Sequence, residues 1–234
     1  MKKSFPAIFL WLAIVILSIF LPDFVRAETL LPTSADTQNE VEKIQKLLKE
    51  IIEKSFPELG AENIKVKTFR SQTTFFKAQF SFARYLTFQS MRTTIFVNPI
   101  VLERNAPEEG IRSILAHELA HALYYKQKNR LELVGLVNLV NDGFTAKFER
   151  KADLIAIERG YGENLIKYRE WLYQNVSAKS LAEKKRNYFT PEEISLLISA
   201  LAKNPELIKH LRKQMPRNLD ELKLAVNSTD NISK

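Results

Sequence analysis

The chain has 234 residues, of which 45% are hydrophobic and 26% are charged. This composition is typical of a globular protein with a well-packed core, and it excludes a disordered protein. The formal net charge of +8 favours anionic partners, but no pattern of interleaved basic and aromatic residues predicts binding to nucleic acid. Because the chain has no cysteine, it forms no disulfide and offers no thiolate metal ligand, so any metal must be held by histidine and carboxylate groups.

The first residues predict export. Lys2 and Lys3 precede an uncharged run over residues 5–21, and Val25-Arg26-Ala27 offers the small residues of a signal peptidase site. Residues 1–27 are therefore predicted to be a signal peptide. The alternative is an N-terminal membrane anchor, because residues 5–21 are just long enough to span a bilayer. In both cases the remaining chain is expected outside the cytoplasm, in the periplasm or the extracellular space.

A linker over residues 28–36 is predicted to precede a helix that begins at Thr37. Thr37 and Glu40 form a capping-box pattern, and apolar side chains then recur at helical spacing as far as Pro57. From residue 64 the period changes to two. Strands are predicted at 64–69, 74–80, 84–89 and 93–99, three or four in one sheet, with their phenylalanines facing the core.

The next predicted helix carries the pattern His117-Glu118-Leu119-Ala120-His121. A spacing of four residues stacks the two histidines on one helical face, so both imidazoles can reach one ion. In the HExxH motif the histidines bind zinc and the glutamate acts as general base on the metal-bound water. Zinc lowers the pKa of that water to roughly 7, which lets a neighbouring carboxylate take its proton.

The setting of this motif is important because the same five letters also occur in proteins that bind no metal. Asn105 and Glu108 form a capping-box pattern, and Pro107 suits the first turn of a helix. Residues 111–123 are apolar on almost every side, which predicts a buried helix. A buried helix tolerates two histidines and a glutamate only for a reason, and a metal supplies one. An edge strand beside this helix is expected to accept an extended peptide by β-addition.

A catalytic zinc site needs a third protein ligand. The chain has only one further histidine, His210, and the longer HExxHxxGxxH pattern is not present. A carboxylate is the better candidate. Residues 142–160 predict a second helix, on which Glu149 and Asp153 share one face with small alanine neighbours. The alternative is that this acidic pair lies on a solvated, charged helix face.

HELAH followed by ExxxD, here Glu149 to Asp153, resembles the gluzincin-type endopeptidases, closest to the group of the CAAX prenyl proteases and the HtpX-like heat-shock proteases. The resemblance covers about residues 94–160. It implies that His117, His121 and Glu149 bind Zn²⁺, that Glu118 is the general base, and that Asp153 orients a ligand histidine. Those membrane proteases have several transmembrane helices and this chain has at most one, so their substrates are not carried over.

Peptide hydrolysis also needs a group that stabilises the oxyanion of the tetrahedral intermediate. The sequence offers His210, Arg169 and several tyrosines, and it does not choose among them. The tyrosines are Tyr161, Tyr168, Tyr173 and Tyr188.

Together these patterns predict an α+β, zincin-like fold over residues 37–227. A small N-terminal sheet lobe at about 60–130 packs on the HExxH helix, and a helical lobe follows at about 131–227. The helical lobe includes an apolar segment at 131–140 and a helix that begins at Thr190, and it ends in a frayed tail at 228–234.

The predicted function is that of an exported zinc endopeptidase that acts on a peptide or protein substrate, with Glu118 as its base. A narrower form of this prediction is a peptidase with a single partner protein as its substrate. The alternative from another class is a non-catalytic envelope-binding module that keeps a structural or vestigial zinc site and binds anionic polymer through its basic helices. The sequence predicts no oligomeric state.

Overall fold

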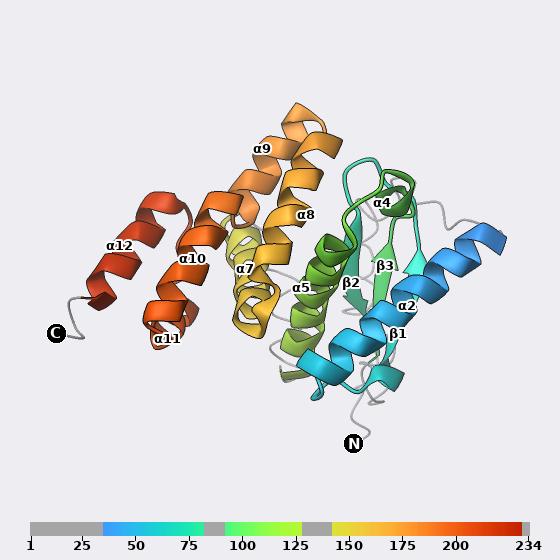
Figure 1. Ribbon diagram of the computed structural model, residues 1–234, viewed down its shortest axis with the longest axis horizontal. Coiled ribbons are helices and arrows are strands. Elements are labelled where there is room, and N and C mark those ends of the chain that lie inside the picture. The colour runs from blue at the N-terminus through green and yellow to red at the C-terminus, as the bar shows by residue number, and fades with distance from the viewer. Residues whose placement is uncertain (1–34, 82–91, 128–141, 231–234) are drawn as a thin grey trace, which may run out of the picture.

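The computed structural model describes residues 35–81, 92–127 and 142–230. Within these ranges the chain is a mixed α+β fold, in which a small sheet lies beside a long helix and a group of helices follows (Figure 1). The predicted export segment, the strand predicted at 84–89 and the apolar segment at 131–140 lie outside the described residues. Among the helices of these ranges, none combines the length and the apolar character needed to cross a bilayer.

The first helix, α2, spans Ala35–Ser55 and begins two residues before the predicted start at Thr37. Its apolar side chains recur at helical spacing and are buried, as the sequence predicts. They are Ile44, Leu47, Leu48, Ile51 and Ile52. The helix packs on β1 and on α5, so it closes the core of the sheet lobe (Figure 1).

Three strands form the sheet: β1 (Ile64–Thr68), β2 (Phe76–Phe80) and β3 (Thr93–Val97), in the order β1-β3-β2. β1 runs parallel to β3, and β2 runs antiparallel to it. The alternation predicted for β3 is confirmed, because Thr93, Ile95 and Val97 are buried while the residues between them are partly exposed. The strand that leads toward the HExxH helix is therefore central, and β1 and β2 are the strands at the two margins of the described sheet.

A short helix, α4 (Ile100–Glu103), leads into α5 (Glu108–Gln127). The helix predicted to be buried is confirmed, because residues 111 and 113–123 of α5 are all buried. Gly110 lets α5 approach α8 closely, since a Cβ atom at this position would lie only 3.2 to 3.3 Å from the Tyr168 backbone and Cβ. The close approach brings the face of α5 that bears the histidines against the helical region.

The helical region begins with α7 (Asp142–Ala156), which continues into a π-helical turn, η2 (Ile157–Tyr161), and α8 (Gly162–Asn175). Gly160 was the predicted end of the first of these helices. It adopts φ 88° within η2, a conformation that favours glycine, and it redirects the chain into α8.

The remaining helices are α9 (Ala178–Asn187), α10 (Pro191–Lys203), α11 (Leu207–Lys213) and α12 (Leu219–Asp230). The predicted start at Thr190 is confirmed by a capping box with Glu193. α12 runs three residues past the predicted domain end at 227, so the first part of the predicted frayed tail is helical. These helices surround a second core that includes Leu154, Phe189, Ile194, Leu197 and Leu211.

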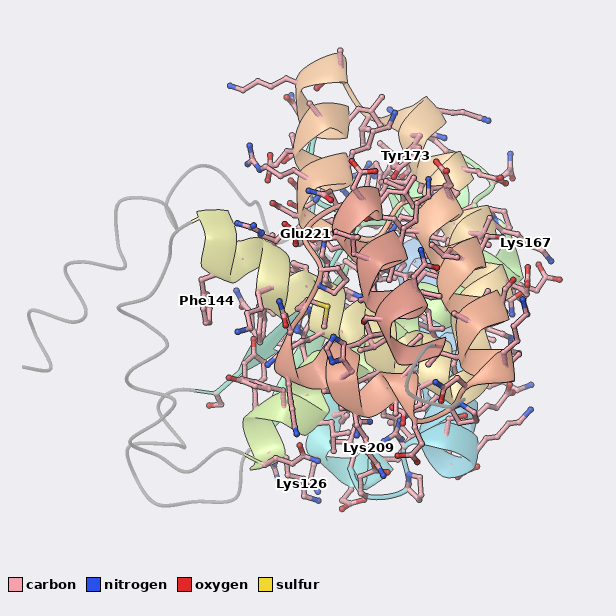
Figure 2. All side chains as sticks on the ribbon, turned by 90° about the vertical axis from the view of Figure 1, so that its left-hand side faces the viewer. Lys126, Phe144, Lys167, Tyr173, Lys209 and Glu221 are labelled. Carbon is pink, nitrogen blue, oxygen red and sulfur yellow. The ribbon has the colours of Figure 1, made fainter. Side chains whose placement is uncertain are left out.

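Figure 2 labels three basic side chains, two of them close together at the lower edge of the view. Lys126 and Lys167 lie near opposite margins of the molecule, and Lys209 lies low on the face toward the viewer. All three side chains are exposed. This arrangement agrees with a positive charge that is spread over the surface.

Candidate metal centre

Two helices that are far apart in the sequence meet at the motif. α5 contributes His117 and His121, and α7 contributes Glu149. The small side chains predicted to lie between these helices are buried, among them Ala120, Ala146 and Ala152. Short side chains allow two helices to approach closely, which is what a glutamate needs to reach the imidazoles of the other helix.

The three side chains converge on one point. His117 Nε2 lies 3.1 Å from His121 Nε2, and each of these nitrogens lies 3.1 Å from Glu149 Oε2. Zinc binds imidazole nitrogen and carboxylate oxygen at roughly 2.0–2.2 Å, so two ligand atoms at tetrahedral corners lie about 3.3–3.5 Å apart. The observed triangle is close to this size, and among the described residues it forms the one His and carboxylate cluster suited to an ion.

The chemistry of these three atoms also fits a cation. The Glu149 oxygen is only an acceptor when it is ionised, and each imidazole nitrogen carries at most one proton. If only one of the two nitrogens carries a proton, that proton can serve at most two of the three close contacts. In the remaining contact two lone pairs face each other. A divalent ion satisfies all three contacts at once, so the residues present fit zinc.

Neighbouring charges control the ionisation of this cluster. Burial raises the pKa of Glu149, but the adjacent His121 and His117 outweigh burial and hold it well below its usual range. Burial lowers the pKa of His117, but the carboxylates of Asp153 and Glu149 outweigh burial and raise it to about 10. The partly buried Glu149 carboxylate therefore stays negative, as a metal ligand must.

Asp153 supports His117 from behind. Its Oδ1 lies 2.7 Å from His117 Nδ1 and accepts a hydrogen bond of 2.7 Å from Arg169 Nη2, and its Oδ2 accepts one of 3.0 Å from the Phe189 backbone N–H. Asp153 is fully buried, and the Arg169 guanidinium and His117 hold its pKa below the usual range against the effect of burial. A proton on Nδ1 leaves Nε2 of His117 free to face Glu149.

Replacement of Asp153 by Asn is expected to lower zinc affinity by roughly 10–100-fold, the usual effect of removing a carboxylate that orients a ligand histidine. It also leaves the buried Arg169 without its counter-ion, which costs about 3–5 kcal/mol of folding free energy. Competition with a zinc chelator and urea unfolding measure the two effects. Asp220→Asn, at an exposed position on α12, is the control. Unchanged zinc affinity in the Asp153 variant would contradict the orienting role.

Glu118 lies beside the triangle and does not contribute to it. Its side chain is buried, and burial raises its pKa above the usual range, partly opposed by His117, His121 and a hydrogen bond to the Ala78 backbone. A carboxylate with a raised pKa is a better proton acceptor near neutral pH. Glu118 and His117 line a pocket that is bounded by β2, α8 and α9.

Three of the predicted oxyanion-stabilising candidates line this pocket: Tyr168, Arg169 and Tyr188. The Tyr188 ring lies 5.8 Å from the His117 ring, between centroids, and two cations lie near it. Arg169 Cζ is 4.6 Å and Lys184 Nζ is 5.2 Å from its centroid. Sequence reasoning did not single out Lys184, because one lysine among the basic residues of α9 gives no distinguishing pattern.

The other candidates lie elsewhere. Tyr161 Oη is 2.9 Å from Ser55 Oγ, and this tyrosine lines a separate pocket next to α2. His210 belongs to α11, which packs around the second core. The Tyr173 hydroxyl is buried and has no hydrogen-bond partner among the described residues. The structure thus brings the predicted ligands, base and orienting carboxylate together, and it places Tyr161 and His210 away from them.

Comparisons of the chain with protein-family models, with curated proteins and with solved structures find no significant match. The functional argument therefore depends on the residues of the site and on the two short motifs that carry the gluzincin resemblance.

Proposed function

We propose that the chain is a zinc-dependent peptidase with a zincin-like site between its sheet lobe and its helical lobe. The observation that carries this proposal is the 3.1 Å triangle formed by His117 Nε2, His121 Nε2 and Glu149 Oε2. Two further features support the proposal. Asp153 fixes the orientation of His117, and a buried carboxylate, Glu118, lies directly beside it. The proposal includes export, which rests on the signal-like residues 1–27 alone.

His117, His121 and Glu149 would hold the zinc ion. When bound, zinc lowers the pKa of water and polarises a carbonyl oxygen, which is the chemistry that amide hydrolysis requires. The protein contributes a dry, fixed set of ligands, because both histidines are buried and His117 is held by Asp153.

Glu118 acts as the general base in this proposal. Its carboxylate takes a proton from the attacking water and passes that proton to the nitrogen of the leaving amine. The raised pKa of Glu118 favours the first step, because a more basic carboxylate holds the proton more strongly. It also lets the same group act as the acid once it is protonated.

Among the tyrosines and Arg169, we assign to Tyr188 the role of stabilising the oxyanion of the tetrahedral intermediate. Burial raises the pKa of Tyr188 well above its usual value, and the Glu149 charge raises it further. The hydroxyl therefore stays protonated and can donate a hydrogen bond. The Arg169 guanidinium next to the ring adds positive charge where negative charge develops in the transition state.

The substrate would extend along β2. The Phe75 carbonyl accepts a hydrogen bond from the Asn98 N–H, and the Ser81 N–H donates one to the Arg92 carbonyl across the same pair of strands. The backbone N–H and C=O groups of every second residue along β2 therefore point toward β3. Phe76 and Ala78 then direct their backbone groups away from β3, and Ala78 is hydrogen bonded to Glu118. An extended peptide added along this side would pass the base.

The purified protein is expected to contain about one zinc ion per chain and to hydrolyse members of a diverse peptide library. Treatment with a chelator is expected to stop hydrolysis, and added zinc is expected to restore it. Metal analysis by mass spectrometry and mass-resolved analysis of the products measure both. A protein without stoichiometric metal would contradict the proposal. A zinc-replete protein that hydrolyses no peptide would favour the non-catalytic envelope-binding alternative.

A further inference from the structure

The pocket beside Glu118 contains an unusual cation, Lys184 of α9. Lys184 Nζ approaches the Tyr188 ring at 5.2 Å, and its side chain lines the same pocket as His117 and Glu118. Within residues 35–81, 92–127 and 142–230, no carboxylate forms an ion pair with it or accepts its hydrogen bond. The other cation of the pocket, Arg169, is paired with Asp153.

The surroundings of Lys184 make this lack of a partner costly. The pocket wall includes the apolar side chains of Phe75, Phe76, Ile114 and Leu172. Burial lowers the pKa of Lys184, and the Glu149 and Glu183 carboxylates oppose this effect only in part. A carboxylate that enters the pocket would restore the lost solvation of the ammonium group through a charge-assisted hydrogen bond.

The position of the pocket indicates which part of a substrate it would hold. In the proposed mechanism Glu118 must reach the nitrogen of the leaving amine, and that nitrogen belongs to the residue after the scissile bond. Glu118 lines the pocket. The substrate group nearest to the pocket is therefore the side chain of the residue that follows the scissile bond. The cavity itself is small, about 30 Å³, and it is open at its mouth, so it suits a compact group such as a carboxylate that enters from solvent.

We infer that Lys184 selects substrates that carry a carboxylate on the residue that follows the scissile bond. The inference rests on the proposed peptidase function and adds a specificity to it. The carboxylate has two sources: the side chain of Asp or Glu, or the terminal carboxylate when that residue ends the substrate chain. The first source describes an endopeptidase with acidic preference, and the second describes a carboxypeptidase.

Matched peptides test the inference with the full-length, zinc-loaded protein. One set has Glu, Gln or Lys after the scissile bond, and a second set ends at that residue with a free or an amidated terminus. The kcat/KM for the carboxylate peptide is expected to exceed that for its neutral match by roughly tenfold or more. The set that shows this ratio identifies the source of the carboxylate.

Three variants assign the ratio to the lysine. In the Lys184→Gln variant, kcat/KM for the Glu peptide is expected to fall close to that for the Gln peptide. In the Lys184→Glu variant the preference is expected to reverse, so that the Lys peptide is cleaved best. Lys179→Gln, an exposed lysine on the same helix, is the matched control and is expected to leave the ratio unchanged. The ratio is informative even where a variant lowers all rates, because a general loss of structure lowers kcat/KM for both peptides by the same factor.

Binding gives a second measurement that needs no turnover. In zinc-loaded Glu118→Gln protein, calorimetry is expected to show tighter binding of the Glu peptide than of the Gln peptide, and Lys184→Gln is expected to remove the difference. If neither peptide set shows a carboxylate-dependent ratio, or if that ratio survives in Lys184→Gln, the inference is overturned, while hydrolysis of neutral peptides still supports the peptidase. If no peptide is hydrolysed, the peptidase proposal fails, and the calorimetry alone decides whether Lys184 binds a carboxylate.

Discussion

Replacement of Glu118 by Gln is expected to lower kcat for peptide hydrolysis by roughly 10²–10⁴-fold, the usual contribution of a general base. Glutamine has nearly the same volume and keeps a carbonyl oxygen that can accept a hydrogen bond from Ala78, but it cannot take a proton from water. Zinc content is expected to stay at the level of the unchanged protein, because Glu118 is not part of the ligand triangle. Steady-state kinetics and metal analysis of one preparation check both outcomes.

Stability measurements separate loss of the base from loss of the fold. Burial raises the pKa of Glu118, so its ionised form costs folding free energy at pH values above that raised pKa, and the cost disappears as pH falls below the usual value for glutamate. A neutral glutamine avoids the cost. The variant is therefore expected to melt no lower than the unchanged protein at neutral pH. Glu109→Gln, at an exposed position in the first turn of the same helix, is the control for activity. Full activity in the Glu118 variant would remove the base assignment.

The parts of the fold that could be predicted are those in which local pattern and burial agree. α5 has a nearly continuous apolar sequence, and its buried residues match that pattern. The predicted cap is wrong, because α5 begins at Glu108 and Asn105 lies before it with φ 50°. Glu149 and Asp153 could be placed on one face because a helical spacing of four fixes their relation on α7. Their proximity to α5 followed from the small residues of both helices, which sequence reasoning used.

The contacts that could not be predicted depend on how the chain returns to the site. Arg169 reaches Asp153 only because Gly160 redirects the chain from α7 into α8, and no periodicity encodes that turn. The Phe189 N–H reaches Asp153 from the segment between α9 and α10. Strand order was equally hidden, since alternation identifies a strand but not its neighbours, and β3 proved central. The pocket that surrounds Lys184 is built from these long-range contacts.

Replacement of Glu149 by Ala is expected to lower zinc affinity by more than about 10²-fold, because a lost ligand costs more than a lost orienting group, for which the range is 10–100-fold. The rate of peptide hydrolysis is expected to fall as the zinc occupancy of the site falls, and to recover only in part at high zinc concentration. Chelator competition measures the affinity, and kinetics at several zinc concentrations measure the recovery. Glu163→Ala, at an exposed position on α8, is the control.

The zinc-free form of the Glu149 variant shows whether the effect is one of ligation or of folding. His121 and His117 hold the pKa of Glu149 well below its usual range, so the ionised carboxylate stabilises the zinc-free fold above that usual value, and this contribution is lost as pH falls through the lowered pKa. The zinc-free variant should therefore melt lower at neutral pH, with a smaller difference in acid. Zinc should raise the melting temperature of the unchanged protein far more than that of the variant, since only the former holds the ion with three ligands. Equal zinc-dependent shifts in both proteins would mean that the ion binds without Glu149, and the proposed triangle would then not be the metal site.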